Sequence, residues 1–260
     1  MDIKKSATGI AFRILRLVGI LAVIYVSMVF YLALTERRNA FPRAITHKEA
    51  REAIANSAKS ITCTTKDGIA LEGWTIGNSV APLLLYYPDA NEDAAQFLAE
   101  VQGKKGFSLA AFNYRGSGSN KGTPSQEAFE ADAKDIAECA AQIGGKTPEF
   151  LAGRGTGAIL AAEQFNGNGN LLLIDPAMSI ADAIGAKYRF LYPKFLVRAD
   201  VKMPAEKLEK FGKRTTILLD RSFSRDTNHT FKSRFGGLNS LERGEKSFAE
   251  ILLYWITQSY

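Results

Sequence analysis

The sequence predicts an α/β protein, a mostly parallel sheet with helices on both faces, preceded by one N-terminal transmembrane helix. Two observations support this prediction. Short apolar runs that suit buried strands alternate with longer segments of helical periodicity. An uncharged apolar stretch, Leu17–Leu34, lies close to the N-terminus. Strands that alternate with helices usually run parallel, because each helix crosses over the sheet between them.

Three regions are expected along the chain. Residues 1–38 form an N-terminal tail and transmembrane anchor, residues 39–60 a short polar helical connector, and residues 61–260 one globular domain. The chain has 260 residues, of which 46% are apolar and 23% charged. After the anchor is removed, roughly 220 residues remain, enough for one domain with a sizeable core.

The N-terminal apolar stretch is just long enough to cross a hydrocarbon layer of about 30 Å. A cleaved signal peptide is the alternative, but its apolar core usually has about 7–15 residues followed by small residues. Here the bulky Phe30, Tyr31, Leu32 and Leu34 occupy the place of the cleavage site. A retained single-pass anchor is therefore favoured. The Lys and Arg residues ahead of it favour an N-terminus inside and a globular domain outside the cytoplasm.

Composition limits the classes of partner and cofactor. The net charge is +6, but Lys and Arg are interleaved with Asp and Glu, and no basic run alternates with aromatics. Nucleic-acid binding is therefore not expected. Expected partners are the membrane, through Leu17–Leu34, and a membrane protein or small hydrophobic ligand. No cofactor or metal site is expected. Cys63 and Cys139 are expected to be two buried thiols rather than a disulfide.

The elements of the globular region follow in a regular order. Lys66-Asp67-Gly68 is a hairpin signal between the first two strands, which should pair antiparallel. The later strands are short apolar runs, typical of strands buried on both faces. The expected strands are 61–65, 69–76, 82–87, 107–112, 149–152, 171–174 and 215–219. The expected helices are 92–104, 125–143, 158–165 and 246–258, with a helical excursion at 180–211.

Four segments of the sequence resemble those of one superfamily, in the same order. Residues 84–93 read Leu-Leu-Tyr-Tyr-Pro-Asp-Ala-Asn-Glu-Asp, and residues 113–125 read Asn-Tyr-Arg-Gly-Ser-Gly-Ser-Asn-Lys-Gly-Thr-Pro-Ser. A strand-to-helix turn reads Gly153-Arg154-Gly155-Thr156-Gly157, and residues 175–179 read Asp-Pro-Ala-Met-Ser. They resemble the H-G-N strand end, the Y-R-G-x-G loop, the G-x-S-x-G nucleophile elbow and the P-F-x-S segment of membrane-anchored serine hydrolases in the α/β-hydrolase superfamily. The resemblance covers about residues 60–258 and implies the α/β-hydrolase fold.

The resemblance also implies where a catalytic triad would stand. That chemistry needs a hydroxyl nucleophile, a histidine base and an orienting acid. The positions equivalent to the family nucleophile, acid and base hold Gly155, Ser224 and Glu245. The histidine of the H-G-N segment is replaced by Pro88 or Asp89, depending on the register. The triad is therefore predicted to be degenerate.

Glycine at the elbow is consistent with a turn that no longer supports catalysis. A residue with a Cβ strains at positive φ by about 1–3 kcal/mol, and glycine does not. Residues that could substitute for the triad are Thr156, Asp220, Asp226 and His229. Ser117 and Ser119 are expected to be turn residues. His47 is expected to be an exposed polar residue of the connector.

Three functions remain open. The sequence favours a catalytically inactive or impaired protein that binds a ligand or partner near the membrane. One alternative is an active hydrolase of esterase, lipase or peptidase type that uses the substitute residues. Another is a structural subunit of a membrane complex, in which Leu17–Leu34 makes the important contacts. The aromatic and basic segment 188–196 lies where relatives cap the cleft, and it could be a ligand lid, a membrane-facing patch or core packing.

Overall fold

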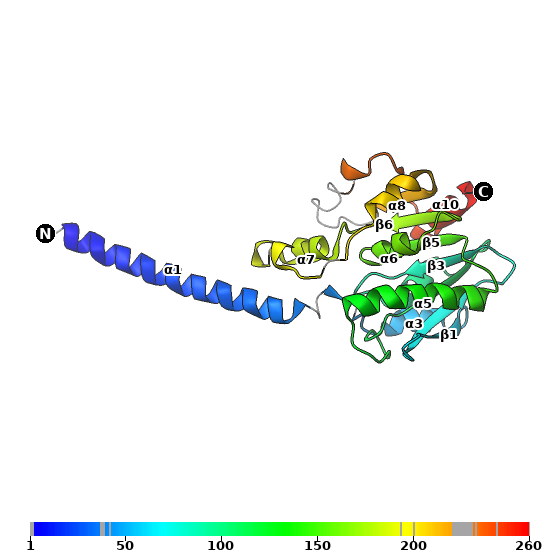
Figure 1. Cartoon of the computed structure of the whole chain (residues 1–260), viewed down its shortest axis with the longest axis horizontal. Helices are drawn as coiled ribbons and strands as arrows, with labels where there is room; N and C mark the ends of the chain where they lie inside the picture. Colours follow the sequence, from blue (N-terminus) through cyan, green and yellow to red (C-terminus); the bar gives the residue numbers. More distant parts are fainter. Residues whose placement is uncertain are drawn as a thin grey trace.

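A long N-terminal helix, α1 (Ile3–Leu34), projects from a globular domain in the computed structural model (Figure 1). The structure describes residues 3–36, 40–41, 43–192, 194–199, 201–219, 231, 233–242 and 244–259. Within this part of the chain, one helix is apolar and long enough to cross a membrane, at Gly9–Leu34. A signal sequence near the N-terminus has the same properties, so α1 is a candidate span.

The domain is built on an eight-stranded sheet with the order β1-β2-β4-β3-β5-β6-β7-β8. The first two strands pair antiparallel across the predicted Asp-Gly turn, β2 pairs antiparallel with β4, and all later pairs are parallel. The predicted mixed sheet with a leading hairpin is confirmed. The strands are β1 (Lys59–Thr64), β2 (Ala70–Ile76), β3 (Leu83–Tyr87), β4 (Ser108–Phe112), β5 (Phe150–Arg154), β6 (Asn170–Ile174), β7 (Thr215–Leu219) and β8 (Asn239–Glu242).

Helices cover both faces of the sheet and create two cores. One core contains apolar residues of α5 (Gln126–Gly144), α6 (Gly157–Gln164) and α7 (Ile180–Tyr188). The other contains residues of α3 (Lys48–Ile54), α4 (Ala94–Val101) and α10 (Phe248–Gln258). Every residue of β3, β4 and β5 is buried, because these central strands have helices on both sides.

The strand β8 was not expected from the sequence. Its residues Asn-Ser-Leu-Glu lack the apolar or β-branched run by which the other strands were identified. It lies at the edge of the sheet, beside β7, and three of its four residues are exposed. Hydrogen bonding to β7, rather than the burial of its own side chains, therefore defines this strand.

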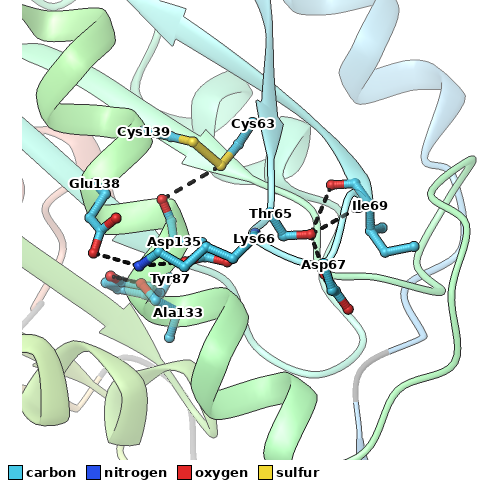
Figure 2. The surroundings of a disulfide bond; sticks show 10 residues. All are labelled: Cys63, Thr65, Lys66, Asp67, Ile69, Tyr87, Ala133, Asp135, Glu138 and Cys139. Carbon is cyan, nitrogen blue, oxygen red and sulfur yellow. Dashed lines mark hydrogen bonds and ion pairs between the residues drawn. A yellow bond between two sulfur atoms is a disulfide. The ribbon is translucent and has the colours of Figure 1, made fainter.

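The two cysteines form a disulfide, so the expectation of two buried thiols was wrong. Cys63 lies on β1 and Cys139 on α5, and their Cα atoms are 5.7 Å apart (Figure 2). The helix packs over the sheet hairpin, which brings residues 76 positions apart within reach of a disulfide. Periodicity could place each cysteine on its element, but it could not reveal which helix face meets which strand.

The connector helix α3 is packed into the domain. Ala50 and Ile54 are buried against the second core. Arg51 forms ion pairs with Glu72 of β2 and Asp93, each at 2.9 Å. These contacts fix the start of the domain close to the carboxyl end of β3.

The segment after β6 lies beside the end of α1. It contains α7, two short 3-10 helices, η1 (Arg189–Leu191) and η2 (Lys194–Leu196), and then α8 (Ala205–Lys210) and η3 (Gly212–Arg214). Residues of α1 near its C-terminal end, among them Leu32, pack into the first core. The segment thus joins the candidate span to the sheet.

Candidate functional site

A tight turn between β5 and α6 forms the centre of the candidate site. Gly155 adopts φ 56° there, the left-handed conformation of a nucleophile elbow. A Cβ on Gly157 would lie 2.2 Å from the carbonyl oxygen of Pro88, and one on Gly153 would lie 2.4 Å from that of Gly157. The flanking glycines therefore permit the close approach of strand and helix, and the elbow geometry is intact.

The Asp89 carboxylate fills the space above this elbow. Its Oδ1 accepts hydrogen bonds from the Thr156 backbone N–H at 2.9 Å and from Thr156 Oγ1 at 3.0 Å. A Cβ built on Gly155 would lie 2.2 Å from the same oxygen. In this fold the N–H after the nucleophile helps to form the oxyanion hole. The Asp89 carboxylate therefore lies where a nucleophile side chain would stand. It also accepts the hydrogen bond of the N–H that would contribute to an oxyanion hole.

A buried network of charged and polar groups holds the Asp89 loop. Glu92 Oε2 accepts hydrogen bonds from the Asp89 backbone N–H at 3.0 Å and from Tyr86 Oη at 2.6 Å. Arg154 forms ion pairs with Glu92 at 2.6 Å and Glu100 at 2.8 Å. Burial raises the pKa of Glu92, and the positive charge of Arg154 opposes this rise. The loop that positions Asp89 is thus tied to the residue before the elbow glycine.

A cavity of about 270 Å³ lies between the elbow and α7. Asp89 and Thr156 contribute polar groups to its lining, and its α7 wall is mainly apolar, with alanine and isoleucine side chains. This arrangement can hold a small ligand that has an apolar part and a polar end. Its lining residues include Ala40, Asp89, Thr156, Ala183, Ile184 and Lys187.

The structure brings only part of the predicted site together. Gly155 and Thr156 line the cavity, whereas Glu245 is exposed before α10 and does not line it. The other predicted positions lie outside the described residues; they are Asp220, Ser224, Asp226 and His229.

The remaining candidates have structural roles. The His47 ring accepts a hydrogen bond from Ala50 N–H at 3.2 Å and so caps α3; His47 is half-buried rather than exposed. Ser117 Oγ accepts from Ala44 N–H at 3.0 Å, and Ser119 Oγ donates to Glu72 at 3.1 Å. Both serines therefore hold their loop against neighbouring segments, the connector and β2.

Sequence reasoning missed the role of Asp89. From the sequence, Asp89 was identified only as one of two possible replacements for the histidine of the H-G-N segment. The signal was nevertheless present, because Asp89 follows β3 directly, and the carboxyl ends of parallel strands meet at one edge of a sheet. No local pattern showed that its side chain would reach the turn after β5.

Among curated proteins, the chain is similar to several that are uncharacterised. It is 28% identical over 184 residues to YfhR of Salmonella typhimurium, which is 66% of this chain and 59% of that protein. It is 26% identical over 132 residues to Rv2307c of Mycobacterium tuberculosis, covering 48% of this chain and 47% of that protein. The chain thus spans less than two thirds of these relatives. No family model matches it.

Solved structures with the same fold are α/β-hydrolases. An α/β-hydrolase from Vibrio vulnificus superposes with a TM-score of 0.64 at 18% identity, covering 88% of this chain and 91% of that one. The Pyrococcus furiosus esterase Pf2001 gives 0.57 at 15% identity, with 84% and 93% covered. A membrane phospholipase A described as a bacterial virulence factor gives 0.52 at 14% identity, with 98% and 99% covered. The chain has the α/β-hydrolase fold, as the sequence predicted.

Proposed function

We propose that this chain is a membrane-anchored α/β-hydrolase-fold protein with lost or impaired hydrolase chemistry, whose cleft binds a ligand or partner. The observation that carries the proposal is the Asp89 carboxylate above Gly155, bound to the Thr156 N–H. A carboxylate at this place would repel the developing oxyanion of an acyl substrate and would compete for its donor. Gly155 itself offers no nucleophile.

A labelling experiment tests the loss of chemistry. The full chain in detergent is treated with a fluorophosphonate probe and assayed with p-nitrophenyl esters, beside a Gly155→Ser variant and an active α/β-hydrolase as positive control. We expect the folded parent and the variant to show neither labelling nor turnover. An adduct mapped to a residue of the cavity would overturn the proposal.

A second candidate function, an active hydrolase with a rebuilt site, is favoured by one contact. Thr156 Oγ1 lies 3.0 Å from Asp89 Oδ1, within reach of a base that could accept its proton. In that case Thr156→Ala would abolish turnover, and Thr156→Ser would retain it. Under the leading proposal both variants stay as inactive as the parent.

Ligand binding has its own test. Ala183 lies on α7 in the wall of the cavity, so Ala183→Phe would fill part of the space. We expect native mass spectrometry of the purified full chain to detect a small apolar molecule that this variant loses. The matched control is Ala131→Phe, at an exposed position of α5. If the parent carries no molecule, or if both variants keep it, the cavity is not the binding site.

The disulfide supports an extracytoplasmic domain. Disulfides persist in oxidising compartments and are rare in the cytosol, which agrees with the orientation favoured by the N-terminal charges. The measurement is accessibility of a C-terminal epitope tag in right-side-out and inverted membrane vesicles. Exposure in right-side-out vesicles is expected, and exposure only in inverted ones would contradict this orientation.

A further inference from the structure

Two large aromatic side chains lie exposed beside the candidate span. Phe190 of η1 is 75% exposed and Phe195 of η2 is 80% exposed. Leu196 is also exposed. We call Phe190, Phe195 and Leu196 the aromatic patch. Exposed apolar groups gathered at one site usually mark a contact with another phase or partner.

The aromatic patch is fixed against α1 rather than hanging free. Tyr25 Oη donates a hydrogen bond to the Phe190 carbonyl oxygen at 3.2 Å. In Figure 1 the yellow segment after α7 reaches out from the domain on the side of α1, and η1 contacts that helix.

The buried Glu36 completes this attachment. Its carboxylate accepts hydrogen bonds from Tyr192 Oη at 2.8 Å and from the backbone N–H groups of Arg198 and Ala199 at 2.7 and 3.0 Å. The segment that carries the patch is thus tied to α1 at Tyr25 and just beyond the end of the helix at Glu36.

The position of Tyr25 in α1 sets the depth of the patch. Tyr25 lies nine residues after Arg16, or about 14 Å along the helix, while the hydrocarbon layer is about 30 Å thick. If Arg16 stays near the headgroups on its side, Tyr25 lies inside the layer. A shift of the helix by two turns, about 11 Å, would still leave Tyr25 inside and would draw Arg16 into the layer. Phe190, whose carbonyl oxygen accepts a hydrogen bond from Tyr25, therefore lies at the depth of the hydrocarbon layer.

Basic residues flank the aromatic patch along the chain. Lys187, Lys194 and Arg198 are exposed and have long apolar stems. Lys194 also forms an ion pair with Asp182 at 3.3 Å, and Arg198 forms one with Glu36 at 3.5 Å. Aromatic groups flanked by Lys and Arg are typical of elements that lie in the membrane interface. The basic side chains and the apolar patch therefore both suit contact with a lipid surface.

We infer that the aromatic patch inserts into the lipid layer beside α1, so that this part of the domain enters the bilayer as well as being tethered to it. The occupant of the patch is the phospholipid bilayer itself. This inference rests on the proposed anchor. It places α7, one wall of the cavity, at the membrane surface, where a ligand could come from the lipid phase.

The test uses the full chain reconstituted into phosphatidylcholine vesicles that contain phosphatidylglycerol. The fluorescent amino acid dansylalanine is incorporated at position 195, or at position 80 as the matched control. Val80 is 89% exposed and lies before β3, at the opposite end of that parallel strand from the site. We expect blue-shifted emission at position 195 and quenching by acyl-chain nitroxide lipids several-fold stronger than at position 80.

Each outcome decides the inference. Equal, weak quenching at both positions would overturn it, and so would a blue-shifted but unquenched probe at position 195, because a protein would then cover the patch. Alkaline carbonate extraction of the same vesicles separates this failure from failure of the anchor. Retention with an unquenched probe refutes the patch alone, whereas release refutes the anchor and the inference together.

Discussion

Gly155 and Asp89 share one small volume, and each depends on the other. Glycine adopts the left-handed turn without strain and leaves room for the carboxylate. The carboxylate in turn accepts the Thr156 N–H at the start of α6, where the helix dipole favours a negative charge. A serine at this position would have to adopt φ 56°, and its Cβ would lie 2.2 Å from the Asp89 carboxylate.

Replacing Gly155 should therefore destabilise the protein without creating activity. For Gly155→Ser we expect a loss of about 1–3 kcal/mol from backbone strain, with a further loss from the clash with Asp89. Urea denaturation of the two single variants and of Gly155→Ser/Asp89→Ala measures this as a double-mutant cycle. Additive losses would show that the two side chains do not compete for one space.

Arg154 forms an ion pair with a carboxylate that is largely removed from bulk water. Glu92 is 9% exposed, and Arg154→Met would leave its charge unpaired in the core. We expect a loss of about 3–5 kcal/mol in unfolding free energy, the usual result of breaking a buried ion pair. The double variant Arg154→Met/Glu92→Gln should recover part of it, because glutamine can still accept from Tyr86 and Asp89. A loss below about 1 kcal/mol for the single variant would contradict the burial of this pair.

Asp67 makes the hairpin turn sensitive to acid. The Arg115 guanidinium, which donates to the Asp67 carboxylate, and the Thr65 hydroxyl lower the pKa of Asp67 from 3.8 to about 2. Because the folded pKa is the lower one, this contribution is present above about pH 4 and disappears as the pH falls through about 2.

We therefore expect Asp67→Asn to lose less stability than the parent between about pH 4 and pH 2. The effect should be modest, since the Asp67 side chain is 55% exposed to solvent. Thermal unfolding across this range measures it, with the exposed Glu245→Gln as control. If both variants follow the parent curve, the Asp67–Arg115 contact does not form.

At the level of elements, a covalent bond and an ion-pair network join the hairpin to α5. The disulfide links β1 to α5, and Arg115 forms a buried ion pair with Asp132 of α5 while it also holds Asp67 in the turn. Figure 2 shows the turn and the disulfide on the same flank of the helix. The antiparallel edge of the sheet is thereby fixed to the helix that covers it.

Loss of the disulfide should weaken this attachment. The double variant Cys63→Ala/Cys139→Ala should lose about 2–4 kcal/mol, because the bond closes a long loop of the unfolded chain. Urea denaturation with and without dithiothreitol is the measurement. Reductant should lower the stability of the parent and leave the variant unchanged. If reductant does not change the stability of the parent protein in urea, the disulfide is absent.

At the level of the whole molecule, α1 is part of the domain as well as a candidate anchor. Its last turns pack into the first core, and Glu36 binds the segment after η2. We expect Glu36→Ala to release this segment, because two backbone N–H groups and the Tyr192 hydroxyl lose their acceptor. Hydrogen exchange should then increase at residues 190–199 and stay unchanged in β3–β5. The control is Glu245→Ala, and exchange equal to that of the parent would contradict this role of Glu36.

The sequence alone determined the features that depend on neighbours along the chain. Apolar runs and helical periodicity identified seven of the strands, the helices around them and the candidate span, because burial on a regular element repeats with that element. The glycine-rich turn was found for the same reason, since its close packing requires glycine at fixed spacing. The resemblance then gave the fold and the position of the elbow.

Only the tertiary structure decided which distant groups meet. Asp89 reaches Thr156 because β3 and β5 are neighbours in the sheet, Cys63 meets Cys139 because α5 covers β1, and Tyr25 binds Phe190 because the chain after α7 returns to α1. Each contact joins residues more than sixty positions apart. Local sequence patterns do not predict such pairs, because the direction of a side chain across a core is set by the packing of the whole domain.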